Sequence, residues 1–189
     1  MTALGGAPLS VVIVGCGRVG AVVAENLDAL GNDVLVIDTN PRAFDRLPPT
    51  FRGRAIRGDG TDEDVLRRAG AENADLFLAL TEGDNRNIIS TQLAAEVLGA
   101  RRVIAKINDP VRATAYADLG IATLCRTNLM ADAISAYLGL PRAYPAGVQA
   151  PTGHHPGGEH HEPPGPVGSG GGVASGSIGS GAVRGREEA

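Results

Sequence analysis

Short apolar runs alternate with amphipathic stretches along the first 140 or so residues of the chain. The run Val11-Val12-Ile13-Val14 is almost entirely β-branched, which is typical of a strand buried on both faces of a parallel sheet. The same reading predicts strands at 10–14, 34–38, 54–57, 76–80, 103–106 and 121–124, with the short, charged 54–57 as the weakest. Helical periodicity predicts helices at 18–30, 41–47, 62–69, 85–98, 110–119 and 128–138.

Capping residues stand at the ends of these predicted helices. Glycines suited to C-terminal caps follow them at Gly31, Gly70, Gly99 and Gly120. Asp62 and Thr127 are candidate N-caps, and Pro110 suits a first helical turn after Asp109. Strands that alternate with helices over short links predict an α/β fold, a Rossmann-type doubly wound parallel sheet of about six strands.

The composition changes after Pro141, where Gly, Pro, Ser, Ala and His dominate and no apolar face repeats. We therefore predict a folded domain at 9–140 and a disordered Gly/Pro/Ser/His-rich tail at 141–189, because such a segment cannot bury enough surface to offset its chain entropy. The pairs His154-His155 and His160-His161 could bind a metal weakly, but solvated histidines are the favoured interpretation, and we expect no metal site.

Charge and apolar content exclude several functional classes. The net charge of −4 argues against a nucleic-acid partner held by bulk charge. Two cysteines make no disulfide framework, which favours a reducing, cytoplasmic location. The start of the chain lacks the features of a signal peptide, and no apolar stretch approaches the roughly 20 residues of a spanning helix. We expect no direct membrane insertion, so that any membrane role comes through a partner.

A glycine-rich loop, Gly15-Cys16-Gly17-Arg18-Val19-Gly20, lies between the first predicted strand and the first predicted helix. Gly15 permits a tight turn, Gly17 lets a pyrophosphate approach the backbone, and Gly20 lets the helix pack close to the sheet. Free N–H groups at the helix start would hold the phosphates. Asp38 ends the second predicted strand, where a dinucleotide-binding fold places a carboxylate for ribose hydroxyls, an arrangement that disfavours NADP.

Three further segments end on the same edge of the predicted sheet. Asp59 and Gly60 follow the third strand, and Asp59 either accepts from an adenine amino group or only orients a turn. The stretch from Thr81 to Asn87 follows the fourth strand across the topological switch point, where ligands bind, and Thr81 is the cofactor-binding residue predicted in it. These residues also suit a helix N-terminus. Lys106 ends the fifth strand and is either a phosphate contact or a surface lysine.

These motifs in this order resemble the nucleotide-binding domain of Trk-type potassium uptake regulators, called the RCK or KTN domain, over about 9–141. The resemblance rests on the segments at 15–20, 36–38, 58–61, 82–88 and 103–110. It implies binding of NAD(H) or of ATP/ADP, with Gly15, Gly17, Arg18 and Val19 at the phosphates, Asp38 at the ribose and Asp59 at the adenine. It also implies that Lys106 contacts a phosphate in its own or in a neighbouring protomer's site.

The resemblance further implies dimers and rings on the cytoplasmic side of potassium channels and transporters. We therefore predict a non-enzymatic regulatory subunit that is peripheral to the inner face of the membrane and has a membrane potassium transporter subunit as its partner. Many family members carry a second α/β domain or a repeat of the unit, and here only 141–189 follows, so a related, separately encoded subunit is a candidate partner. The apolar stripe of 128–138 packs either on its own sheet or in a homodimer or heterodimer.

Two alternative functions compete with this prediction. An NAD-dependent oxidoreductase needs a substrate domain and a placed acid or base, and the predicted folded region contains no histidine. A nucleotide-sensing repressor needs a basic helix-turn-helix, which the sequence does not show.

Overall fold

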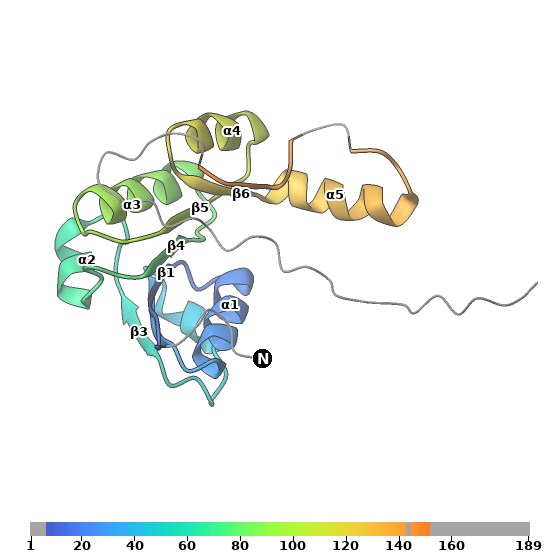
Figure 1. Cartoon of the computed structure of the whole chain (residues 1–189). Coiled ribbons are helices and arrows are strands. Elements are labelled where there is room, and N and C mark those ends of the chain that lie inside the picture. Colours follow the sequence, from blue (N-terminus) through green and yellow to red (C-terminus); the bar gives the residue numbers. More distant parts are fainter. Residues whose placement is uncertain (1–6, 143–144, 152–189) are drawn as a thin grey trace, which may run out of the picture. The chain divides into compact units, whose positions relative to one another are not determined.

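Strands and helices alternate through the computed structural model, which describes residues 7–142 and 145–151 (Figure 1). These residues belong to the first of two compact units, Met1–Gly158. The elements, in chain order, are β1 (Ser10–Val14), α1 (Arg18–Ala29), β2 (Asp33–Asp38), the 3-10 helix η1 (Pro41–Arg46), β3 (Arg54–Arg57), α2 (Glu63–Ala69), β4 (Leu76–Ala79), α3 (Asp84–Glu96), β5 (Val103–Ile107), α4 (Pro110–Asp118), β6 (Ala122–Cys125), α5 (Arg126–Leu138) and β7 (Val148–Gln149).

The strands form one sheet in the order β3-β2-β1-β4-β5-β6-β7. The strands β1 to β6 pair in parallel, so the predicted doubly wound sheet is confirmed, including the short β3, which pairs with β2. The chain runs outward from β1 to β3 and then returns to place β4 on the other side of β1. The carboxyl ends of β1 and β4 therefore flank the switch point at which open α/β sheets bind ligands.

Alternating residues of the strands build a core on each face of the sheet. Val12 and Val14 belong to the cluster that contains Leu66 of α2, Ile88 of α3 and Ala113 of α4. Val11 and Ile13 belong to the opposite cluster, with Ala21 and Ala24 of α1 and Ala43 of η1. Burial on both faces explains the near-continuous apolar runs in the sequence.

Most of the predicted caps are confirmed. The Asp62 carboxylate accepts from the Val65 N–H at 3.1 Å, and that of Asp109 accepts from the Val111 N–H at 2.8 Å with Pro110 in the first turn. The four predicted C-terminal glycines all have positive φ, at 84° for Gly31, 80° for Gly70, 69° for Gly99 and 91° for Gly120. These are conformations that L side chains rarely adopt.

Two local predictions are wrong. The segment 41–47 forms a short 3-10 helix, Pro41–Arg46, and not an α-helix. Leu47 is extended, as is usual for a residue before a proline, so the helix ends after six residues, and short connectors of this kind commonly form 3-10 turns. Thr127 is not an N-cap, because α5 already begins at Arg126 after Cys125. The Thr127 hydroxyl instead donates to the Asn108 carbonyl at 2.7 Å, which ties the start of α5 to the end of β5.

A seventh strand, β7, lies in the segment 141–189 that the sequence predicted to be disordered, so that prediction is wrong for these residues. It pairs antiparallel with β6, and the Gly147 carbonyl just before it accepts from the Cys125 N–H at 2.7 Å. A Cβ at Gly147 would lie 2.6 Å from the Leu129 N atom, so only glycine fits against α5 here. A strand of two residues has no periodicity that a sequence could show, so β7 could not be predicted. The rest of the predicted disordered tail, 152–189, lies outside the described residues.

Candidate functional site

A cleft of about 200 Å³ opens where β1, β2, β3 and β4 end. Its walls come from the loops that follow these four strands, at Val14, Gly15, Gly17, Ile37, Asp38, Thr39, Gly58, Asp59, Gly60, Leu80, Thr81, Glu82 and Arg86. The structure thus brings together Gly15, Gly17, Asp38, Asp59, Gly60 and Thr81 of the predicted site. Arg18, Val19, Gly20 and Lys106 do not line the cleft.

The three glycines of the loop have different surroundings. Gly15 has a φ of 105°, and a Cβ there would lie 2.9 Å from the Thr81 N atom. A Cβ on Gly17 would meet no atom within 4 Å, which leaves room for a ligand against the backbone. A Cβ on Gly20 would lie 2.0 Å from the Gly15 carbonyl oxygen but 3.8 Å from Ile13 of the sheet. Gly20 therefore lets α1 pack against its own glycine loop more than against the sheet.

The partial positive charge at the N-terminus of α1, where the glycine loop leads into the helix, has no side chain to compensate it in the cap or in the first turn. The N-cap of this helix is Gly17, which supplies no side chain to accept from the first N–H groups, and its first turn contains no acidic residue. Arg18 and Val19 are exposed there and supply backbone N–H groups and one cationic side chain. Such a helix end favours an anionic group.

Asp38 joins the end of β2 to the glycine loop. One carboxylate oxygen accepts from the Cys16 N–H at 2.7 Å, and the other accepts from the Asn40 N–H at 2.8 Å. Each oxygen can accept a second hydrogen bond, so the carboxylate can also bind a ligand hydroxyl. Cys16 itself is fully buried, and burial, followed by the nearby Asp38 charge, raises the pKa of its thiol. A protonated, buried thiol is a structural residue and not a nucleophile.

Asp59 organises the loop after β3. One of its oxygens accepts from the Thr61 N–H at 3.0 Å and from the Thr61 hydroxyl at 2.8 Å. The pKa of the Asp59 carboxyl is lowered, most strongly by the backbone hydrogen bond from Thr61 and then by the Thr61 hydroxyl. The Arg86 guanidinium lowers it further, whereas burial acts in the opposite direction. Gly60 lies against β1, because a Cβ there would be 2.3 Å from a Val14 methyl carbon. Asp59 thus orients the loop and also lines the cleft.

Replacement of Thr61 by Val should raise the pKa of Asp59 only partway to its ordinary value. The substitution removes the hydroxyl donor but keeps the backbone N–H, which is the larger cause of the lowered pKa. A carboxyl whose pKa is lower in the folded than in the unfolded state stabilises the fold at pH values above its unfolded pKa. This stabilisation is lost as the pH falls through the folded pKa. Because the folded pKa is higher in the variant, the variant should lose the stabilisation at a higher pH. A carboxyl NMR titration measures the shift, and an unchanged Asp59 pKa would contradict the assignment.

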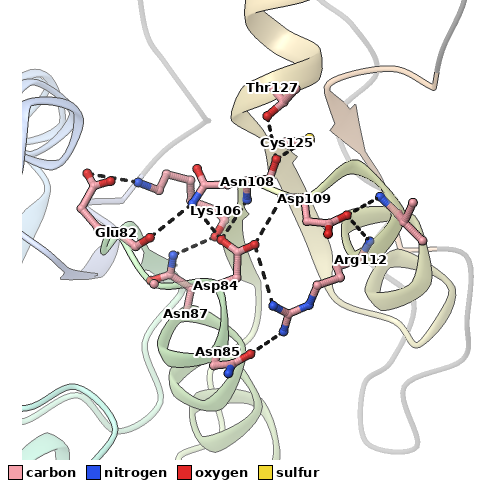
Figure 2. A network of polar contacts seen from close by, with 12 residues as sticks. Glu82, Asp84, Asn85, Asn87, Lys106, Asn108, Asp109, Arg112, Cys125 and Thr127 are labelled. Atoms are coloured by element: carbon pink, nitrogen blue, oxygen red, sulfur yellow. Dashed lines mark hydrogen bonds and ion pairs between the residues drawn. The ribbon is translucent and has the colours of Figure 1, made fainter.

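Thr81 is held in place by Asn87, a completely buried residue of α3. The Asn87 side-chain oxygen accepts from the Thr81 N–H at 2.9 Å and from its hydroxyl at 2.6 Å. The Asn87 amide group donates to the Thr81 carbonyl at 3.0 Å and to the Lys106 carbonyl at 2.7 Å. One amide therefore fixes the ends of both β4 and β5 beside the cleft, as Figure 2 shows for Lys106.

Lys106 is not a surface lysine, because its side chain is only 9% exposed. Its Nζ atom lies 3.5 Å from a carboxylate oxygen of Glu82, which does line the cleft (Figure 2). The predicted phosphate contact of Lys106 stays a prediction, since one side chain separates its charge from the cleft.

Glu82 and Arg86 are cleft residues that the sequence pattern does not single out. Both lie in the stretch after β4 that is expected near a ligand by its position, but Thr81 is the one residue of that stretch predicted to bind. Their position after β4 is the only sequence signal that points to a ligand. Their charge adds no signal for Glu82, because acidic residues are favoured near any helix N-terminus.

Metal-binding clusters and membrane-spanning helices are both missing from the described part of the chain. That part holds no group of three or more His, Cys, Asp or Glu side chains that could hold a metal ion. The two histidine pairs lie outside it. Within residues 7–142 and 145–151, no helix has both the length and the apolar character needed to cross a membrane.

Comparison with known proteins identifies relatives of this chain in sequence and in fold. Residues 11–127 match the TrkA-N domain family. The chain is 43% identical over 149 residues to a Trk system potassium uptake protein TrkA of Streptomyces coelicolor, which covers 77% of this chain and 65% of that protein. The chain therefore spans slightly less than two-thirds of this relative's length.

Two solved structures share the architecture. The Kef CTD of Shewanella denitrificans in its AMP-bound form has a TM-score of 0.58 and 26% identity, covering 71% of this chain and 83% of that one. The GsuK RCK domain has a TM-score of 0.54 and 25% identity, covering 71% of this chain and 31% of that one.

Proposed function

This chain belongs to the TrkA-N domain family, and we propose that it binds NAD(H) or an adenine nucleotide such as ATP or ADP and thereby regulates a potassium uptake transporter or channel. The observation that carries the proposal is the cleft at the switch point, where the open side of Gly17, the uncapped start of α1 and the Asp38 carboxylate converge.

Relatives support both parts of this proposal. The Streptomyces coelicolor relative is named as a potassium uptake protein, and GsuK contains a domain of the same fold. The Kef domain of Shewanella denitrificans is described in an AMP-bound form, which supports an adenine nucleotide here.

We assign the ligand groups by the order of the strands along the cleft. Asp59 and Gly60 after β3 lie at the adenine, Asp38 after β2 at the ribose, and the glycine loop with Arg18 and Val19 after β1 at the phosphates. Thr81 after β4 closes the loop against Gly15, and Lys106 after β5 is the next cation along this edge.

Replacement of Asp38 by Ala should weaken nucleotide binding about tenfold or more, because a ribose hydroxyl loses a charged acceptor worth about 1.5–3 kcal/mol. Calorimetry and thermal shift with NADH, NAD, ATP, ADP and AMP measure the effect, since a ligand that binds only the folded state raises the melting temperature. Asp33→Ala, at the other end of β2, is the matched control. No shift with any of these nucleotides at millimolar concentration would overturn the proposal.

We propose that the regulation is non-enzymatic and works by population shift. The described residues contain no histidine, and the one cysteine of the glycine loop is buried and protonated. A nucleotide can then act only by binding two conformations of the assembly with unequal affinity.

A related copy of the domain is the proposed partner of α5, on the cytoplasmic side of a membrane transporter subunit. The predicted alternative, packing of the apolar stripe on its own sheet, is wrong, because Asn128 is the one buried residue among the described side chains of α5. Ile134 is 53% exposed and Tyr137 is 91% exposed, and Met130 and Leu138 of the same helix are exposed as well. An uncovered stripe of this kind fits a two-fold, self-complementary interface.

Ile134→Asp should shift a dimer toward monomer in sedimentation experiments, because it places an unpaired charge in an apolar contact. Leu30→Asp is the matched control, since Leu30 at the end of α1 is equally exposed, at 54%. A wild-type protein that remains monomeric at tens of micromolar, with no related subunit bound, would contradict this interface.

A further inference from the structure

Charged residues follow one another along the carboxyl edge of the sheet beyond the glycine loop. The strand order places Glu82 after β4, Lys106 near the end of β5 and Arg126 directly after β6, at the start of α5, each one strand farther from β1. If adenosine occupies the β3–β2 side and the phosphates occupy the glycine loop, whatever extends past those phosphates meets Glu82 first.

Glu82 forms a bridge between the two cations. One carboxylate oxygen lies 3.5 Å from the Lys106 Nζ atom, and the other lies 3.7 Å from an Arg126 Nη atom. The three side chains differ in exposure, at 84% for Glu82, 60% for Arg126 and 9% for Lys106. The pair of Glu82 with Arg126 joins two exposed side chains and contributes little to stability, so stability does not account for the place of Arg126 in this arrangement.

The bridge can open without disturbing the fold. The backbone of Glu82 is fixed, because its carbonyl accepts from the Asn108 amide at 3.2 Å, but its exposed side chain is free to rotate (Figure 2). Asn108 is itself held by the Asp84 carboxylate at 2.8 Å. Removal of the Glu82 carboxylate therefore leaves two cations beside the cleft in an intact scaffold.

We propose that Glu82 is a specificity-determining residue that competes with the terminal phosphate of a nucleoside triphosphate for Lys106 and Arg126. Carboxylate and phosphate oxygens are alternative partners for the same lysine and arginine donors. While Glu82 holds these donors, a third phosphate meets a like charge, whereas a ligand that ends at its first or second phosphate does not reach it. The inference rests on the proposed function, because it presupposes a nucleotide in the cleft.

The test compares AMP, ADP and ATP by calorimetry in the presence of EDTA, with the wild type and with Glu82→Gln. We expect Glu82→Gln to bind ATP about tenfold more tightly than the wild type, equivalent to about 1.4 kcal/mol, with the AMP affinity within about twofold. Glu72→Gln is the matched control: it makes the same change in net charge and also removes an ion pair, the one with Arg67, but lies before β4 at the opposite edge of the sheet.

A second variant tests the cations themselves. Adding Arg126→Gln to Glu82→Gln should return the ATP affinity toward the wild-type value and leave AMP binding unchanged. The inference is overturned if AMP and ATP affinities change by the same factor, if Glu72→Gln gives the same gain, or if Arg126→Gln has no effect in that background. If the wild type binds AMP but Glu82→Gln has the same preference between AMP and ATP as the wild type, this inference alone is overturned. If the wild type binds none of the nucleotides, the proposed function is overturned as well.

Discussion

Gly17→Val is expected to weaken nucleotide binding by roughly 100-fold or more, equivalent to about 2.7 kcal/mol, and to leave the melting temperature of the ligand-free protein almost unchanged. The backbone at Gly17 has φ −74° and ψ −173°, which any residue adopts, and a Cβ there meets no protein atom within 4 Å. The new side chain therefore fits the free protein but occupies the space in which a pyrophosphate would approach the loop.

Two other glycines separate this effect from a general intolerance of side chains. Gly83→Val is the matched control, because Gly83 is also an N-cap with negative φ and no side-chain cap, but lies outside the lining of the cleft. A Cβ at Gly83 would lie within 4 Å of a single atom, a carbon of Arg86. Gly20→Ala should fail in the opposite way, by unfolding, because its Cβ would lie 2.0 Å from a carbonyl oxygen. Calorimetry that finds Gly17→Val binding as tightly as the wild type would place the ligand elsewhere.

The architecture could be predicted because the information is local and repeated. The buried strands are short apolar runs, β-branched in β1 and β2, and helices such as α2 and α4 carry their own capping signals, Asp62 and Asp109. The parallel order then follows from the alternation of strands and helices. The 3-10 helix after Asn40 could not be told from an α-helix, because over so few residues the apolar spacing is similar in both.

The candidate site was predictable only where backbone conformation or strand position specifies it. The glycine loop and Asp38 follow from such rules, and the structure brings them together. Glu82 and Arg86 face the same cleft, but their direction depends on pairings with Lys106, Arg126 and Asp59 across separate strands. No pattern within one segment encodes those pairings, which is also why the burial of Lys106 could not be predicted.

Asn87→Leu is expected to destabilise the fold by about 3–5 kcal/mol, among the larger effects of a single substitution. Asn87 is completely buried, and its amide satisfies the Thr81 N–H, hydroxyl and carbonyl as well as the Lys106 carbonyl. A leucine has the same branching but can neither donate nor accept, so the Thr81 N–H and carbonyl and the Lys106 carbonyl lose these hydrogen bonds, while the Thr81 hydroxyl, as a donor, keeps only its 3.5 Å contact with the Gly83 carbonyl. Each buried group left unsatisfied costs about 1–3 kcal/mol. Urea denaturation measures the loss, and a change below about 1 kcal/mol would contradict this role.

Asn85→Leu, on the exposed side of the same helix, is the control and should stay within about 0.5 kcal/mol of the wild type. Asn87→Asp tests how the loss of stability at this position depends on pH. Its carboxylate could still accept from Thr81 but would face the Thr81 and Lys106 carbonyl oxygens with no proton to donate, so its folded pKa should be raised by burial and repulsion. A raised pKa means that the folded state binds the proton more tightly, so the penalty relative to wild type should be small below the unfolded value near 3.9 and should grow as the pH rises toward 7. An Asn87→Asp penalty that is constant between pH 4 and 7 would show that the carbonyl contacts of Asn87 do not hold β4 and β5 together.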